Sequence, residues 1–231
     1  MKQFLLIAIA AATLSAQAGP EPKLRARELF YKDAAQKTSG PKAAAAPVLG
    51  VKYRLMRSSA ASEFAEASAA TTFRNGDKLR IVVEANADSY LYIAAKGTSG
   101  AWEVLFPNAK TAGGDNRVQK MKAATINFSV QGEPGEEKVF LILSRQPETN
   151  LDGIIYKVSG GTGAAPPPRL IASRINAIDD AMIGRVRNAV RSRDLVFESV
   201  DDDRKEKAAY VVNASAAPDA RLYADIAIKH R

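Results

Sequence analysis

An alternation of apolar and polar side chains with a period of two dominates the chain from Val51 onward. In "DKLRIVVEAN", for example, Leu79, Ile81 and Val83 share one face of an extended backbone. Similar stretches are separated by the turn-forming segments "NGD", "GTSG", "AGGDN" and "GEPGE", in which Gly, Asn, Asp and Pro favour tight turns. Short strands at such regular spacing predict a mainly β fold, an antiparallel β-sandwich of the jelly-roll or immunoglobulin-like kind.

One helix is expected before the last strands. "INAIDDAMIGRVRNAVRSR" places Ile178, Met182, Val186 and Val190 at four-residue steps, which predicts an amphipathic helix around residues 176–191. Three alternating stretches follow it, "DLVFESV", "AAYVVNA" and "RLYADIAIKH". We therefore expect residues 51–231 to form a single β-sandwich domain.

The first 50 residues have a different composition. Residues 1–18 carry one Lys, a short apolar run and small residues up to Ala18, the pattern of a signal peptide cleaved before Gly19. The apolar run is shorter than the ~20 residues of a membrane span. We therefore expect a periplasmic or secreted protein. Residues 19–50 are rich in Ala, Pro, Gly and Lys, which predicts a flexible tether. A short helical motif within it, "LRARELFYKD", is expected to dock on the domain, with partner binding as the alternative.

The residues that usually carry catalysis are scarce. The chain has no Cys, and its one His, His230, is next to last, where termini usually fray. The run Asp201–Asp203 lacks the alternating spacing of calcium ligands. We expect no catalytic residue, metal or cofactor. Scattered carboxylates nevertheless leave a carboxylate-dependent carbohydrate-active hydrolase as an alternative.

The charge balance bears on possible partners. A formal net charge of +8 favours anionic partners at low salt, so an electrostatic polyanion binder is a further alternative. Because no nucleic-acid recognition motif is present, nucleic acid is not an expected partner. The sequence does not indicate an oligomeric state.

Two tyrosines in "EANADSYLYIAA" raise the question of a binding surface. If a two- or four-residue loop joins the flanking strands, Tyr92 faces the core. With a three-residue loop at 87–89, which we favour, Leu91 and Ile93 face the core. The tyrosines then share a face with Arg80. This makes Tyr90, Tyr92, Trp102 and Arg80 the candidate ligand-binding residues, since planar rings stack on sugars or peptide side chains. The competing expectation is that the predicted helix or the tether covers these rings, because large aromatic residues are usually buried.

The same region carries a family resemblance. "FRNGDKLRIVVEANADSYLYIAAKGTSGAWEVLFPN", followed by "GDNRV" and "PGEEKVFLILSRQPE", resembles the bacterial domain of unknown function number 4384 over roughly Val51 to Glu148. The resemblance implies a β-rich module of the kind also found joined to caspase-like peptidases and protein kinases. This occurrence implies an accessory or binding role. Because neither partner is fused in this sequence, the resemblance carries over no associated activity, and it transfers no catalytic or ligand residue.

These observations together predict a non-catalytic secreted or periplasmic accessory module. Its expected ligand is a cell-envelope component, either a glycan or a partner protein.

Overall fold

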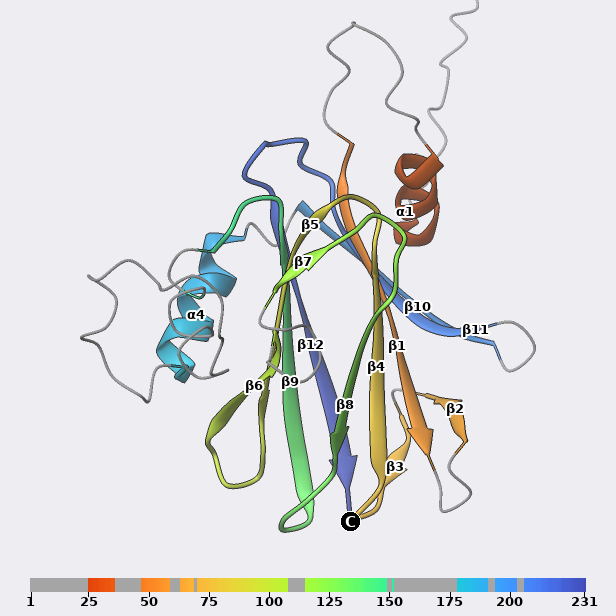
Figure 1. Cartoon of the computed structure of the whole chain (residues 1–231), viewed down its shortest axis with the longest axis vertical. Coiled ribbons are helices and arrows are strands. Elements are labelled where there is room, and N and C mark those ends of the chain that lie inside the picture. The colour runs from red at the N-terminus through yellow and green to blue at the C-terminus, as the bar shows by residue number, and fades with distance from the viewer. Residues whose placement is uncertain are drawn as a thin grey trace, which may run out of the picture.

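The computed structural model describes residues 25–35, 47–58, 63–68, 70–107, 115–148, 151, 178–190, 194–202 and 206–231. The expected signal peptide, its cleavage site and much of the 19–50 segment lie outside these ranges. Two β-sheets pack face to face, and a helix lies on the outer side of each (Figure 1). The predicted mainly β sandwich is confirmed.

The first sheet, sheet A, has the strand order β10-β11-β1-β4-β8, with β2 also paired to β1. All its pairs are antiparallel. β11 pairs with the first half of β1 and β2 with the second half. Its strands are β1 (Leu49–Ser58), β2 (Phe64–Ala67), β4 (Lys78–Ala85), β8 (Ala124–Ser129), β10 (Leu195–Asp202) and β11 (Glu206–Asn213).

The second sheet, sheet B, has the order β3-β12-β9-β5-β6, with β7 paired to β5. Its pairs are antiparallel except for the short parallel contact between β3 and β12. Its strands are β3 (Thr72–Phe73), β5 (Ser89–Lys96), β6 (Trp102–Phe106), β7 (Arg117–Val118), β9 (Gly135–Ser144) and β12 (Arg221–His230).

The main core lies between the sheets. Alternate residues of each long strand point inward, as the period of two predicts. Leu79, Ile81 and Val83 come from sheet A, and Leu141 and Leu143 from sheet B, all at most 1% exposed. The alternation in the sequence therefore identified the inward face of β4.

The expected hairpin between residues 78 and 96 is wrong. β4 and β5 belong to different sheets, so residues 86–88 cross from one layer to the other. Asn86 makes the crossing possible, because its Oδ1 accepts from the Gly50 backbone N–H at 2.7 Å and its Nδ2 donates to the Val48 carbonyl at 3.0 Å. The Asn86 backbone N–H still donates to the Gly50 carbonyl at 3.0 Å, so the side-chain bonds add to the backbone pairing just where the chain leaves sheet A.

The two helices cover opposite outer faces. α1 (Ala26–Ala35) packs Ala26 and Phe30 on sheet A, and both residues are 0% exposed. α4 (Asp180–Ala189) packs on sheet B, and its N-cap Asp179 accepts from the Met182 N–H at 2.7 Å. α4 is the predicted helix before the C-terminal strands. Neither described helix has the length and apolar character needed to cross a bilayer.

Candidate functional site

The predicted tyrosine pair lies on the outer face of sheet B, beneath α4. Leu91 and Ile93 do face the core, as the favoured loop predicted, but the tyrosines do not share a face with Arg80. Tyr92 is only 2% exposed and packs in a cluster with Met182 and Ile183 of α4. Its hydroxyl accepts from the Glu148 N–H at 2.8 Å. This ring is therefore part of a second hydrophobic core.

Trp102 stays half-buried at the rim of this cluster and helps to hold α4. Its Nε1 donates to Asp180 Oδ1 at 3.0 Å, while Lys96 Nζ donates to Oδ2 of the same carboxylate at 2.6 Å. The hydrogen bonds from Lys96 and Trp102 lower the pKa of Asp180. Because Asp180 is the first residue of α4, a negative charge there also suits the helix dipole.

The remaining two candidates have separate surroundings. Tyr90 is half-buried, with the Arg117 guanidinium 5.8 Å from its ring centroid. Arg80 lies on the outer face of sheet A, where its Nε donates to Asn127 Oδ1 at 2.9 Å and its guanidinium sits 3.8 Å from the Phe64 ring centroid. The structure thus gathers Tyr90, Tyr92 and Trp102 around α4 and places Arg80 on the opposite side of the sandwich.

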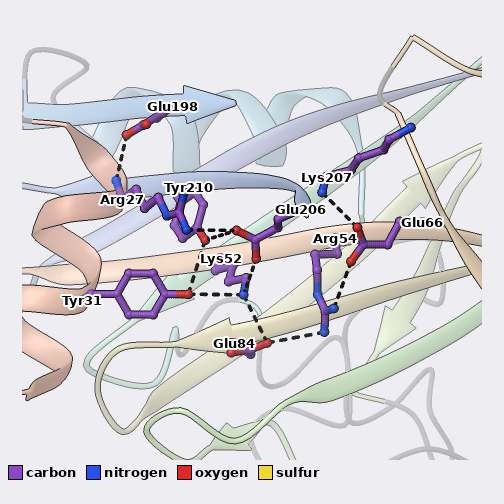
Figure 2. A network of polar contacts seen from close by, with 10 residues as sticks. All are labelled: Arg27, Tyr31, Lys52, Arg54, Glu66, Glu84, Glu198, Glu206, Lys207 and Tyr210. Atoms are coloured by element: carbon purple, nitrogen blue, oxygen red, sulfur yellow. Dashed lines mark hydrogen bonds and ion pairs between the residues drawn. The ribbon is translucent and has the colours of Figure 1, made fainter. Parts of the chain in front are cut away.

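Sheet A holds a polar network that the sequence reasoning missed. Figure 2 shows it between α1 and strands β1, β4 and β11. At its centre Lys52 Nζ lies 2.6 Å from Glu206 Oε1 and 3.9 Å from Glu84 Oε1. The Tyr210 hydroxyl donates to Glu206 Oε2 at 2.7 Å, and the Lys52 ammonium donates to the Tyr31 hydroxyl of α1 at 3.4 Å.

The network continues to both sides of this centre. Arg54 bridges Glu84 at 3.7 Å and Glu66 at 3.1 Å. The Arg27 N–H donates to Glu198 Oε2 at 3.0 Å, which ties α1 to β10. Lys52, Arg54 and Glu84 stood on the polar sides of alternating strands, and that was the only signal in the sequence.

Electrostatics stabilise the charged forms of Lys52 and Glu206 in this network. Burial by itself lowers the pKa of Lys52, but the hydrogen bond to Glu206 and the Glu84 charge outweigh it, so the pKa is raised. Burial would raise the pKa of Glu206, yet the hydrogen bonds from Lys52 and Tyr210 lower it. Burial and the bond to Glu206 raise the pKa of Tyr210. Apart from the buried Arg54 Nε, which has no hydrogen-bond partner among the described residues, the charged groups of the network are paired, and its contacts to Tyr31 and Arg27 join α1 to sheet A.

His230 departs from the expected frayed terminus. It ends β12 with its side chain 0% exposed, and its Nε2 lies 3.6 Å from Glu137 Oε1. Burial raises the pKa of Glu137, while the proximity of His230 opposes that shift. Glu137 also lines a cavity of about 370 Å³ together with Glu103 and Gln131. Among the described residues, no group of His, Asp and Glu is arranged to hold a metal ion.

The backbone of β12 has a definite orientation. In an antiparallel ladder, alternate residues direct their N–H and C=O groups to opposite neighbours. The Arg231 N–H donates to the Phe73 carbonyl of β3 at 3.0 Å, and the Arg221 carbonyl accepts from Asn213 Nδ2 at 2.6 Å. The odd-numbered residues of β12 therefore face away from β9.

Among the described strands, none lies beside most of that side of β12. β3 pairs only with Lys229 and His230, although β9 pairs along the whole of β12. Within the described ranges, Tyr223, Asp225 and Ala227 thus direct backbone donors and acceptors to an unpaired sheet edge.

Sheet A extends beyond this edge. Figure 1 shows β10 and β11 running to the side, away from β12. Consistent with this, the inward-pointing residues Phe197, Ser199 and Asp201 of β10 are exposed, and Phe197 is 60% exposed. A cavity of about 80 Å³ lies beside Phe197, and its lining includes Tyr53, Phe197, Ala209 and Ile226. We call these four residues and the unpaired edge of β12 the edge groove.

Tyr53 supplies a neutral hydroxyl to the edge groove. Burial, with a smaller contribution from the Asp225 carboxylate, raises the pKa of Tyr53 to about 12. The groove wall therefore remains uncharged at this position at any physiological pH.

The comparisons with known proteins identify part of the chain. The family model described as "Domain of unknown function (DUF4384)" matches residues 72–147, which run from β3 to just beyond β9. This confirms the resemblance stated above. Neither curated proteins nor solved structures gave a match. The matched segment contains all four predicted candidate residues, whereas α1, β1 and β10 to β12 lie outside it.

Proposed function

We propose that this chain, which carries the DUF4384 match over residues 72–147, is a non-catalytic accessory module that binds a partner protein through the edge groove. The observation that carries the proposal is the exposed ring of Phe197 above the unpaired edge of β12. The module acts in the periplasm or outside the cell, a location supported by the signal-peptide pattern of residues 1–18.

The edge groove is distinctive because the two helices cover aromatic residues on the outer faces of the sheets. α1 and α4 cover the outer faces of the two sheets, so the aromatic residues there already have partners within the chain. Among the described large apolar residues, Tyr31 and Met121 are 38% and 39% exposed, and Phe197 stands well above them at 60%. Aromatic side chains are enriched at the centres of protein interfaces, where they contribute much of the binding energy.

The mixed composition of the groove favours a protein over a polyanion. Its lining is mainly apolar, and the Asp201 carboxylate at its end lies 3.9 Å from Lys207 Nζ. A polyanion would need an excess of cations here, and its binding would weaken steeply with salt. Apolar contacts are much less sensitive to salt.

The test is a pull-down from envelope extract with the chain beginning at Gly19, washed at low and at high salt. Phe197→Ala removes the exposed ring, and Met121→Ala is the matched control, because it truncates an exposed apolar side chain outside the groove. We expect the wild type and Met121→Ala to retain the same protein at high salt and Phe197→Ala to lose it. Equal retention by all three, or capture at low salt only, would contradict the proposal.

A further inference from the structure

We propose that the partner binds as an added β-strand along the edge of β12, in line with β3 and beneath β10. This inference rests on the proposed function and specifies its geometry. The occupant is one extended segment of a partner protein, with apolar side chains at alternate positions.

The backbone of β12 supplies the main recognition elements. Tyr223, Asp225 and Ala227 each direct an N–H and a C=O toward the unpaired edge, as the orientation of the neighbouring Arg221 and Arg231 requires. Their spacing is that of every second residue of a strand, roughly 7 Å. Only another extended polypeptide presents donors and acceptors with the same repeat, so a glycan or a lipid surface does not match it.

The edge itself lacks the usual protection against strand addition. β12 is ten residues long and pairs with β9 without a break in register from Arg221 to His230. No proline or bulge interrupts it. Natural edge strands are usually short, bulged or covered, so a long regular edge indicates a place where another strand is received.

The position of β3 limits the length of the added segment. β3 already occupies the edge opposite Lys229 and His230, where it runs parallel to β12. The segment can therefore pair from Tyr223 to Ala227 only, which corresponds to about five residues of extended chain.

The position of β10 favours a single strand, and not a second copy of the whole domain, as the occupant of the β12 edge. Two copies joined edge to edge would have to bring their β10 strands past each other, since sheet A continues to β10 and Phe197 of that strand is 60% exposed. A symmetric pairing centred on Asp225 would also set two carboxylates directly opposite, which is unfavourable. A lone strand avoids both conflicts.

The chemistry of the segment follows from its two faces. Side chains that point into the sandwich would meet Phe197, Tyr53 and Ile226, so they should be apolar. Side chains on the other face lie beside Asp225, which already pairs with Arg187 of α4, and they should be polar. The preferred segment thus alternates apolar and polar residues and has no proline at a hydrogen-bonding position.

The experiment uses peptides, because any segment with the right alternation of apolar and polar residues should bind by strand addition, even if it does not come from the natural partner. Random dodecapeptides displayed on phage are selected against the chain beginning at Gly19, and enriched peptides are measured by fluorescence anisotropy. Ala227→Pro removes one edge N–H without removing a bond to β9. Ala227→Val keeps that N–H and is the matched control.

We expect enriched peptides to alternate apolar and polar residues and to bind the wild type and Ala227→Val alike. Ala227→Pro should weaken binding by about tenfold, because one backbone hydrogen bond is lost and its acceptor is left unpaired. Peptide binding should also slow amide exchange at Tyr223, Asp225 and Ala227 of the wild type. This second measurement does not depend on how well the proline variant folds.

Three results would overturn the inference: no enrichment, equal binding by Ala227→Pro, or protection of amides elsewhere. The pull-down then separates the two proposals. If Phe197→Ala loses the partner and Ala227→Pro retains it, strand addition is wrong and the binding function stands. If both variants retain it, both proposals fail.

Discussion

Replacement of Lys52 by Met tests whether the network beneath α1 is energetically coupled. Met keeps most of the length of the Lys stem and removes the ammonium that joins Glu206, Glu84 and Tyr31. The side chains of Lys52, Glu206 and Glu84 are 10%, 14% and 16% exposed. The ion pairs of Lys52 with these two carboxylates therefore resemble buried ion pairs more than surface ion pairs.

These contacts set a range for the unfolding free energy that Lys52→Met should lose. Surface pairs contribute about 0–1 kcal/mol, and removal of one partner of a buried pair costs about 3–5 kcal/mol. In Lys52→Met, Glu206 would keep the Tyr210 hydroxyl at 2.7 Å and the Arg27 guanidinium at 3.9 Å. We therefore expect the lower end of the buried range, about 3 kcal/mol of unfolding free energy. For a domain of this size that corresponds to a melting temperature lower by about 6–12 °C.

Urea unfolding of the chain beginning at Gly19 measures this cost, and a double-mutant cycle isolates the coupling. Lys78→Met is the matched control, since Lys78 is exposed on β4, and it should change stability by less than about 0.5 kcal/mol. Adding Glu206→Gln to Lys52→Met should recover about 1 kcal/mol, because the carboxylate that has lost its nearest cation is removed. A loss below about 1 kcal/mol for Lys52→Met, or strict additivity in the cycle, would refute the coupling.

Two further predictions concern burial and pH. Tyr92→Ala should lower the unfolding free energy by about 3–5 kcal/mol, and Trp102→Ala should lower it by about 1–2 kcal/mol, because only the Tyr92 ring is fully buried. Thermal or urea unfolding measures both values. Equal costs for the two variants would contradict the placement of Tyr92 beneath α4. Because the folded pKa of Glu206 lies below the ordinary value of 4.5, its contribution to stability should be complete above pH 4.5 and lost as the pH falls through the folded pKa. Unfolding measured against pH should therefore show a smaller acid loss in Glu206→Gln than in the wild type, and identical profiles would rule out this contribution.

The candidate aromatic residues show where pattern reasoning stops. The period of two placed Tyr90 and Tyr92 on one face and Leu91 and Ile93 on the other, which is correct. The sequence interpretation also assumed that consecutive strands pair with each other, and this assumption is wrong at residues 86–88. The bonds of Asn86 that permit the crossing join it to Gly50 and Val48, which are far away in sequence.

The edge groove was equally hidden in the sequence. Phe197 belongs to an ordinary alternating strand, and nothing local distinguishes it from Leu195, which is partly buried against the core. Its exposure arises because only the two-residue β3 lies beyond β12 in sheet B, while sheet A continues to β10. The widths of two stacked sheets are set by long-range pairing, which no short sequence window contains.

The sequence by itself determined the long strands, the helix α4, the inward faces of β4 and β5, and the family resemblance over the central region. These follow from local chemistry, since backbone preference and side-chain periodicity act between near neighbours along the chain. Only the tertiary structure decided which sheet each strand joins, which outer faces the helices cover, and which aromatic side chain stays exposed. Those outcomes depend on contacts between distant segments, such as Lys52 with Glu206 and β12 with β9, whose partners are selected only when the whole domain packs.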